Sequence, residues 1–304
     1  METKPGSMRL ARPLLGTFVE IAVEDAALPE TEAAMERAFA AIARVHRLMS
    51  FHDPDSDISR LNREACAGAV AVDRWTYQVL ECAVDLHRRS TGLFDIAVAP
   101  VLQVMGLLPN PGDDPSPASM NSRADEAIEL LAARRVRFTY PGVRIDLGGI
   151  AKGFAVDRAV DVLRSCGLER GLVNAGGDLA VFGPRPQTVF IRDPRDPRRL
   201  MGSVEAQNEA LASTGARFDP FLGADALGVS VIDPRTREPA RTASGVTVRA
   251  PSCMIADALT KVVMIAGESA AALLEHYGAS ALLVLANGEV RITADWQGAV
   301  SLAA

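Results

Sequence analysis

The spacing of apolar residues changes from every second position to every third or fourth near the start of the chain. Thr17–Val23 alternates between apolar and polar residues, which is typical of a strand with one buried face. A helix is predicted for residues 30–49 and another for residues 74–89, the latter ending at Thr91 and Gly92. The first helix has one apolar stripe, formed by Met35, Phe39, Ile42, Val45 and Met49.

Strand patterns dominate the middle of the chain. A short helix is predicted for residues 124–133, and a hairpin at Pro141–Gly142 is predicted to join VRFTY to VRIDL. Further strands are expected in GLVNAGGDLAVFG, TVFIRDP, SVEAQ, ALAST, VSVID and VTVRA. Helices return at residues 252–265 and 268–277, before a closing hairpin in ALLVLANGEVRIT. Because strands cluster while helices lie toward both ends, the pattern predicts an α+β fold with a mixed, largely antiparallel sheet core and flanking helices.

The length of 304 residues fits one large domain or two smaller ones. We expect a single unit over residues 9–304, preceded by an extension or tag at residues 1–8. The stretch 107–119 is rich in proline, glycine and aspartate. It is therefore the predicted place for a flexible flap or for a boundary between two subdomains.

Composition and charge narrow the class of protein. With 48% apolar and 23% charged residues, the composition is that of a globular protein. The net charge of −6 argues against nucleic acid or an anionic membrane as a partner. No apolar stretch is long enough for membrane insertion and no secretion signal is visible, so we expect a cytoplasmic chain, with a processed periplasmic form left open. The oligomeric state, a homodimer included, also stays open.

The segment Arg144–Asp157, RIDLGGIAKGFAVD, places an acid, two glycines and a lysine at a predicted turn from strand to helix. Free amides at the helix start and the charge of Lys152 favour an anion such as a phosphate. Asp146 would be repelled there unless it accepts a hydrogen bond or faces a cation. The alternative is an ordinary glycine turn before a helix.

Three further polar groups have both a structural and a functional interpretation. Asn174–Asp178, NAGGD, is either a tight turn or a close approach to a ligand. Ser213–Gly215 ends a predicted strand and is not specific by itself. Asp257 lies within an apolar helix, where an ionised carboxylate is costly unless it is paired or bound to a metal.

Taken in order, these blocks resemble the ApbE family of FAD:protein FMN transferases. The similarity runs through LLGTFVEI, MSFHDPDSDISRLN, TGLFDIAVAPV, RIDLGGIAKGFAVD, GLVNAGGDLAVFG, ALASTG, VIDPRT and MIADALT. It implies a T-fold-related architecture, FAD as substrate and Mg²⁺ as cofactor. It also implies transfer of FMN to a Thr or Ser hydroxyl of an acceptor flavoprotein, with release of AMP.

The resemblance also assigns residues. Asp146 and Lys152 would contact FAD, while the carbonyl of Gly149 and the carboxylate of Asp257 would hold the metal. Its remaining FAD contacts fall on Leu15, His52, Leu93, Phe94, Asp95, Asn174, Gly176, Gly177, Asp178, Ser213, Thr214, Gly215 and Ile232. Among these, His52 and Phe94 are candidates to stack on a ring.

The chain departs from the family pattern near the metal. Lys261 stands where the family has a Thr that donates its hydroxyl to the metal, and an ammonium group repels Mg²⁺. Either Lys261 replaces a cation near the pyrophosphate, or it points away and Thr260 is the ligand. The expected catalytic residues are thus Asp257, Lys152 and Lys261.

Two more departures lie in VSVIDPRTRE. Ser230 replaces a His that many members carry and that could deprotonate the acceptor hydroxyl. Arg237 replaces a Gly, which affects local turn geometry. The alternative to a transferase is therefore a non-catalytic FAD-binding protein of the same fold, acting in flavin carriage or flavoprotein assembly.

Overall fold

The computed structural model describes residues 7–24, 30–110, 123–215, 231–293, 296 and 300–302. The chain forms two compact units. The first unit comprises Met1–Ala43, Lys152–Asp233 and Glu238–Ala304, and the second comprises Arg44–Ala151 and Pro234–Arg237.

The domain predictions fall partly outside the described residues. Of the expected extension at residues 1–8, only Ser7 and Met8 are described, and Met8 already begins the first strand. The loop 107–119 lies within the second unit, and its residues 111–119 are outside the described part of the chain. The chain passes between the units near residues 43 and 151, and again on either side of Pro234–Arg237.

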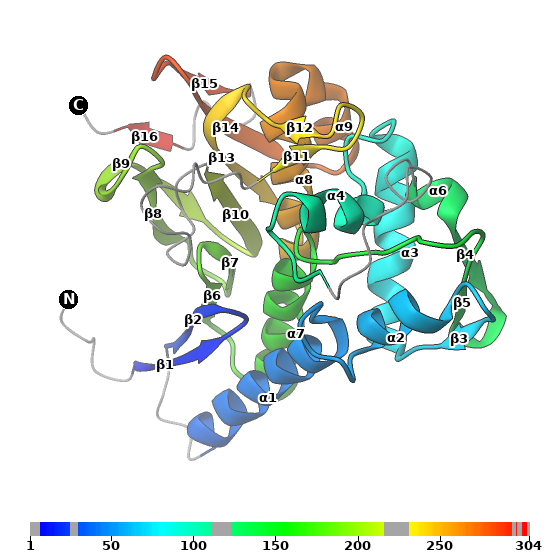
Figure 1. Cartoon of the computed structure of the whole chain (residues 1–304). Coiled ribbons are helices and arrows are strands. Elements are labelled where there is room, and N and C mark those ends of the chain that lie inside the picture. Colours follow the sequence, from blue (N-terminus) through cyan, green and yellow to red (C-terminus); the bar gives the residue numbers. More distant parts are fainter. Residues whose placement is uncertain are drawn as a thin grey trace. The chain divides into compact units, whose positions relative to one another are not determined.

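An eight-stranded antiparallel sheet forms the centre of the first unit (Figure 1). Its strands, in spatial order, are β1 (Met8–Leu14), β2 (Thr17–Val23), β6 (Gly171–Ala175), β7 (Asp178–Phe182), β10 (Glu209–Gly215), β13 (Ala243–Ala250), β14 (Ser280–Leu285) and β15 (Val290–Ile292). The helices of this unit are α7 (Ala151–Ser165), α8 (Cys253–Ala266), η3 (Gly267–Ala270) and α9 (Ala271–His276), and α1 (Thr31–Met49) begins in it. This arrangement confirms the predicted α+β fold.

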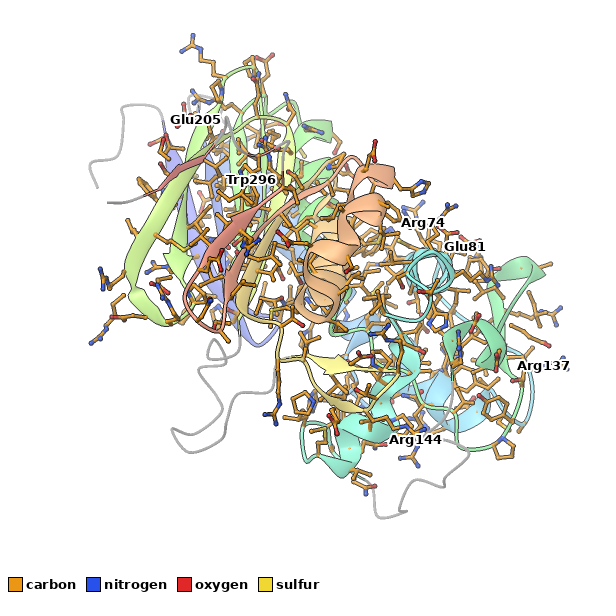
Figure 2. The ribbon with its side chains drawn as sticks, turned by 90° about the horizontal axis from the view of Figure 1, so that it is seen from above. Arg74, Glu81, Arg137, Arg144, Glu205 and Trp296 are labelled. Atoms are coloured by element: carbon orange, nitrogen blue, oxygen red, sulfur yellow. The ribbon has the colours of Figure 1, made fainter. Side chains whose placement is uncertain are left out.

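The large sheet is covered on both faces. Helix α8 packs against β7, β10 and β13. On the other face lies a small sheet of β8 (Gln187–Asp193), β9 (Asp196–Ala206) and β16 (Val300–Leu302). An apolar cluster joins the two sheets, with Leu211 and Leu282 from the large one and Ile191 and Val204 from the small one. Trp296, which is fully buried, completes this cluster (Figure 2).

The second unit is built mainly from short helices. They are α2 (Asp57–Glu64), α3 (Arg74–Arg89), η1 (Ile96–Val98), α4 (Ala99–Val104), α6 (Ala124–Ala127) and η2 (Ala132–Arg134), with a small sheet of β3 (Val70–Ala71), β5 (Arg135–Phe138) and β4 (Ile128–Leu131). The side chains of Ser56 and Asp73 accept hydrogen bonds at the starts of α2 and α3. Helix α3 ends before Thr91 and Gly92, both at positive φ, as the sequence predicts.

Two local predictions are wrong. The helix expected over 124–133 stops at Ala127 and continues as β4, which pairs with β5. The hairpin expected at Pro141–Gly142 does not form, because β5 pairs with β3 and β4 and residues 143–147 form no strand. The side chain of Asn62 instead makes two hydrogen bonds to the backbone of Ile145, at 2.8 and 2.9 Å.

The hairpin of β11 (Ile232–Asp233) and β12 (Glu238–Pro239) carries the turn at Pro234–Arg237. Arg237 has φ +61°, a left-handed conformation that favours glycine. Arg237 therefore adopts the backbone conformation that a glycine would adopt in this turn, at a cost in strain. Ser230 lies outside the described residues.

Candidate functional site

Helices α7 and α8 approach each other very closely at Gly153. A Cβ on this residue would lie 2.2 Å from the carbonyl oxygen of Cys253 and 2.9 Å from the Cβ of Asp257. The amide of Gly153 donates to Oδ2 of Asp257 at 3.1 Å. One turn later, the carboxylate of Asp157 accepts from the amides of Cys253 and Met254 at 2.8 and 2.9 Å. The sequence KGFAVD thus fixes the start of α8, and Asp257 with it, against α7.

Two lysines and two aspartates form a buried charge cluster beside this contact. Lys152, in the first turn of α7, pairs with Asp178 at the start of β7. Lys261 pairs with Oδ1 of Asp257 one turn earlier on α8. The two carboxylate side chains are almost fully buried, and the two lysine side chains are 34% and 17% exposed. The charges of this cluster therefore sum to zero within the protein.

The pKa values of the cluster reflect burial and mutual pairing. Burial opposes the charged form of Lys152, but Asp178 and Asp257 outweigh it and raise the pKa of this lysine. Burial likewise opposes ionisation of Asp257, and Lys261 and Lys152 overcome it and lower the pKa of this carboxyl. Burial and the neighbouring Asp257 raise the pKa of Asp178. Lys152 is thus held as a cation by its neighbouring carboxylates.

The remaining polar groups of α8 face β10. The hydroxyl of Thr260 donates to the carbonyl oxygen of Asp257 at 2.6 Å, and it lies 2.8 Å from the hydroxyl of Thr214. Thr214 is also 3.4 Å from Nζ of Lys261. Thr260 is fully buried. Its hydroxyl is therefore engaged by protein groups on both sides.

The first unit contains a cavity of about 480 Å³ between its two sheets. Six residues that the sequence assigns to FAD binding line it: Asn174, Gly176, Gly177, Ser213, Thr214 and Gly215. Apolar side chains of both sheets, Leu211 and Ile191 among them, form much of the remaining wall. Because Thr214 lines this wall and its hydroxyl lies 3.4 Å from Nζ of Lys261, the cavity and the charge cluster adjoin.

The NAGGD turn has the features of a tight turn and also contributes to the cavity. The side chain of Asn174 accepts from the amide of Gly177 at 2.9 Å. Gly176 has φ +66°, and a Cβ there would lie 2.6 Å from the hydroxyl of Thr17. Asp178 pairs with Lys152, and its Oδ1 has no hydrogen-bond partner among the described residues. The two interpretations of this turn are therefore compatible.

Other predicted site residues lie in the second unit. The amide of Asp146 donates to the carbonyl of Ile96 at 2.9 Å, and Oδ2 of Asp146 accepts from the amide of Gly148 at 3.1 Å. Burial raises the pKa of Asp146. Gly149 follows in the same turn and is half-buried.

The predicted block Leu93–Asp95 is held inside the second unit. Phe94 is 4% exposed, so its ring belongs to the core and is not a free surface for stacking. The carboxylate of Asp95 accepts from the amide of Ala97 at 2.7 Å and faces inward. His52, by contrast, is exposed, and its ring makes an edge contact with that of Phe51, with 6.3 Å between the ring centroids. Leu15 and Ile232, in the first unit, are half-buried and buried.

His87 is a buried structural residue to which the sequence assigns no role in the site. Its Nδ1 lies 3.0 Å from the carbonyl oxygen of Phe94 and 3.2 Å from Oδ2 of Asp95, and its Nε2 lies 2.9 Å from Asp125. Burial opposes its charged form, but the two acids outweigh burial and raise its pKa. In the sequence, the one indication of these contacts is that a histidine precedes Phe94 by seven residues.

The donor set around Asp257 does not fit a divalent cation. Lys261 occupies Oδ1, and the amide of Gly153 donates to Oδ2. The hydroxyl of Thr260 is engaged as described above. Within the described part of the chain, no group of three His, Cys, Asp or Glu residues could hold a metal. The alternative in which Lys261 points away from Asp257 is wrong, because the two form an ion pair.

The fold and this site define a member of a known family. Residues 15–285 match the sequence model of the ApbE family, and the chain therefore belongs to that family. This confirms the family expected from the sequence. Within the described residues, none of the helices is both long and apolar enough to span a bilayer.

Individual relatives cover most of the chain. A protein of Treponema pallidum named FAD:protein FMN transferase is 27% identical over 93% of this chain and 86% of its own length. A protein of the same name from Vibrio cholerae is 29% identical over 86% and 82%. The crystal structure of the ApbE protein of Thermotoga maritima superposes with a TM-score of 0.84 at 27% identity, covering 96% of this chain and 98% of that one.

Proposed function

We propose that this chain is an FAD:protein FMN transferase, which transfers FMN from FAD to a Thr or Ser hydroxyl of an acceptor flavoprotein and releases AMP. The observation that carries this proposal is the buried cluster of Lys152 and Lys261 with their aspartates, which adjoins an apolar cavity through Thr214. A cavity with apolar walls suits a flavin ring, and ammonium groups suit a pyrophosphate. The relatives named for this activity match the chain over nearly its whole length.

The transfer breaks one phosphorus–oxygen bond and forms another. The acceptor hydroxyl oxygen attacks the phosphorus of the FMN half, and the bond from that phosphorus to the bridging oxygen breaks. AMP leaves with the bridging oxygen, and the hydroxyl proton goes to its phosphate or to water. Such reactions depend mainly on positioning and on neutralising the charge that develops on the phosphate oxygens. In this proposal Lys152 and Lys261 supply positive charge for this purpose.

The residues around Asp257 do not fit the expected Mg²⁺. When bound, such an ion neutralises phosphate charge and orients the leaving group. The oxygen of Asp257 that would face it is held by Lys261. No step above is therefore assigned to a metal.

The ion pair of Lys261 also favours a second candidate function. A protein that binds FAD through the same cluster, without transferring FMN, would act in flavin carriage or flavoprotein assembly. This candidate predicts saturable FAD binding with no release of AMP under any condition.

Covalent flavin labelling separates the two functions. The protein is incubated with FAD and a flavin acceptor domain of an ApbE substrate, and the acceptor is examined by gel fluorescence and intact mass, with AMP measured by chromatography. Labelling with equimolar AMP supports the transferase, and binding without either product supports the carrier. Lys152→Met should abolish labelling, whereas Arg198→Met, which removes an exposed cation paired with Asp196, should leave it unchanged.

A further inference from the structure

The ammonium group of Lys261 lies among oxygen atoms of three chemical kinds. Its Nζ pairs with the Asp257 carboxylate, lies 3.1 Å from the Asp257 carbonyl oxygen and lies 3.4 Å from the Thr214 hydroxyl. Carboxylate, carbonyl and hydroxyl oxygens are the donors that hard cations such as Mg²⁺ and Ca²⁺ take in proteins. The nitrogen therefore occupies a place whose surroundings suit a small cation.

The charge balance of the cluster leaves no room for an additional dication. Lys152 and Lys261 neutralise Asp178 and Asp257 within a buried region. In the absence of FAD, adding a divalent cation would leave an excess of two positive charges in surroundings where uncompensated charge is costly. With Thr in place of Lys261, as the family pattern has it, the cluster would carry one net negative charge. That state would attract a cation, whereas the present one does not.

Lysine is a rare residue in this chain. Lys4, Lys152 and Lys261 are its three lysines, against 29 arginines. Both lysines of the described structure belong to the charge cluster. A lysine ammonium is a compact point charge, whereas arginine presents a planar fork that suits bidentate pairing and does not fit a small cage of oxygens. The use of lysine at this position therefore matches the replacement of an ion.

We propose that the ammonium group of Lys261 takes the place of the divalent cation at Asp257, so that this chain binds FAD and transfers FMN without a bound metal. Transfer of FMN without a metal rests on the proposed transferase function, whereas the replacement of the cation by Lys261 concerns ligand binding alone. Lys261 then neutralises the phosphate that leaves with AMP, and Asp257 holds the ammonium in position. Thr214 connects this group to the cavity.

Measurements of metal and FAD binding test directly whether Lys261 replaces the cation. Full-length protein is titrated with Mn²⁺ and followed by electron paramagnetic resonance, and FAD affinity is measured by flavin fluorescence with EDTA or with Mg²⁺. We expect no stoichiometric Mn²⁺ site and an FAD dissociation constant that changes less than about threefold. In the Lys261→Thr variant we expect a Mn²⁺ site to appear and FAD binding to become dependent on Mg²⁺ by about tenfold or more.

Labelling of the acceptor tests whether FMN is transferred without a bound metal. Wild-type protein should label at similar rates in EDTA and in Mg²⁺. Lys261→Met, which keeps the length but removes the charge, should lose about 100-fold or more in rate. Lys261→Thr should label only with Mg²⁺. Circular dichroism and the Arg198→Met control show whether any loss is due to unfolding.

The outcomes distinguish this inference from the proposed function. Stoichiometric Mn²⁺ binding by the wild type, with labelling that EDTA abolishes and Mg²⁺ restores, would overturn the inference and leave the transferase standing. No labelling in any buffer would overturn the transferase, and the Mn²⁺ and FAD titrations would still decide the role of Lys261. Unchanged metal and FAD binding in Lys261→Thr would also refute the inference.

Discussion

Replacing Gly153 by alanine tests the contact that places Asp257. The new Cβ would lie 2.2 Å from the carbonyl oxygen of Cys253, whereas carbon and carbonyl oxygen atoms in contact lie about 3.3 Å apart or more. The obstacle is backbone, which cannot rotate away as a flexible side chain would. Helices α7 and α8 must therefore separate by roughly 1 Å at this point, a distance that protein cores resist.

Three effects determine the size of the change. Overpacking costs about 1–3 kcal/mol. Stretching the hydrogen bond from the Gly153 amide to the Asp257 carboxylate costs up to about 1.5–3 kcal/mol, since one partner is charged. The higher helix propensity of alanine offsets about 1 kcal/mol. We expect a net destabilisation of about 2–4 kcal/mol, or a melting temperature lower by roughly 5–15 °C for a unit of this size.

Trp296 provides a probe for the first unit alone. In a Trp75→Phe background it is the remaining tryptophan, and it is fully buried in the cluster between the two sheets. Thermal unfolding followed by the fluorescence of Trp296 should show the lower melting temperature of Gly153→Ala. Ser165→Ala, at an exposed position of the same helix, gains helix propensity without a clash and should shift the midpoint little. An equal or higher midpoint in Gly153→Ala would refute the argument from close packing.

Three further changes test the second unit. Asn62→Ala removes both hydrogen bonds to the backbone of Ile145 and should lower the free energy of unfolding in urea by about 2–3 kcal/mol. An unchanged midpoint would contradict this. Burial raises the folded-state pKa of Asp146, so ionisation of this carboxyl destabilises the fold as pH rises above its unfolded-state pKa. Asp146→Asn should therefore raise the melting temperature at pH 7 but not below pH 3. An equal gain at both pH values would exclude this cause. Arg237→Gly should stabilise by up to about 1 kcal/mol in the same urea assay, because relief of the φ of +61° outweighs the added entropy of the unfolded chain; a lower midpoint would contradict this.

Periodicity and turn chemistry predict most of the first unit. The antiparallel strands of the large sheet, the stripe of α1 and the start and end of α8 follow from patterns that depend on local sequence. The failures in the second unit have a common cause. Residues 128–131 have helix-compatible side chains but form β4, because β5 offers an open edge for pairing. Tertiary pairing of this kind overrides propensity and is not visible in a short window.

The candidate site likewise combines contacts that the local sequence predicts with contacts that only tertiary packing creates. The sequence predicts that Asp257 must be paired or metal-bound because it lies in an apolar helix, and the structure shows that it is paired. The partner could have been found, since an acid four residues before a lysine is a common helical ion pair. The pairing of Lys152 with Asp178 could not, because 26 residues separate them and only the sheet brings them together. Likewise, the seclusion of Phe94 depends on packing that the motif TGLFD does not encode by itself.

The close approach of α7 and α8 links the fold to the metal-free site. The Gly153 amide uses Oδ2 of Asp257, so that only Oδ1 is left for a cation, and Lys261 reaches that oxygen from one turn away. A side chain at residue 153 would move Asp257 away from the Gly153 amide and from Lys152, both on α7, whereas Lys261, on the same helix as Asp257, would move with it. Oδ2 of Asp257 would then lose its donor, and the Asp257–Lys261 pair would be displaced from the rest of the buried cluster. Gly153→Ala should therefore weaken FAD binding as well as stability, whereas a purely structural glycine would affect stability alone.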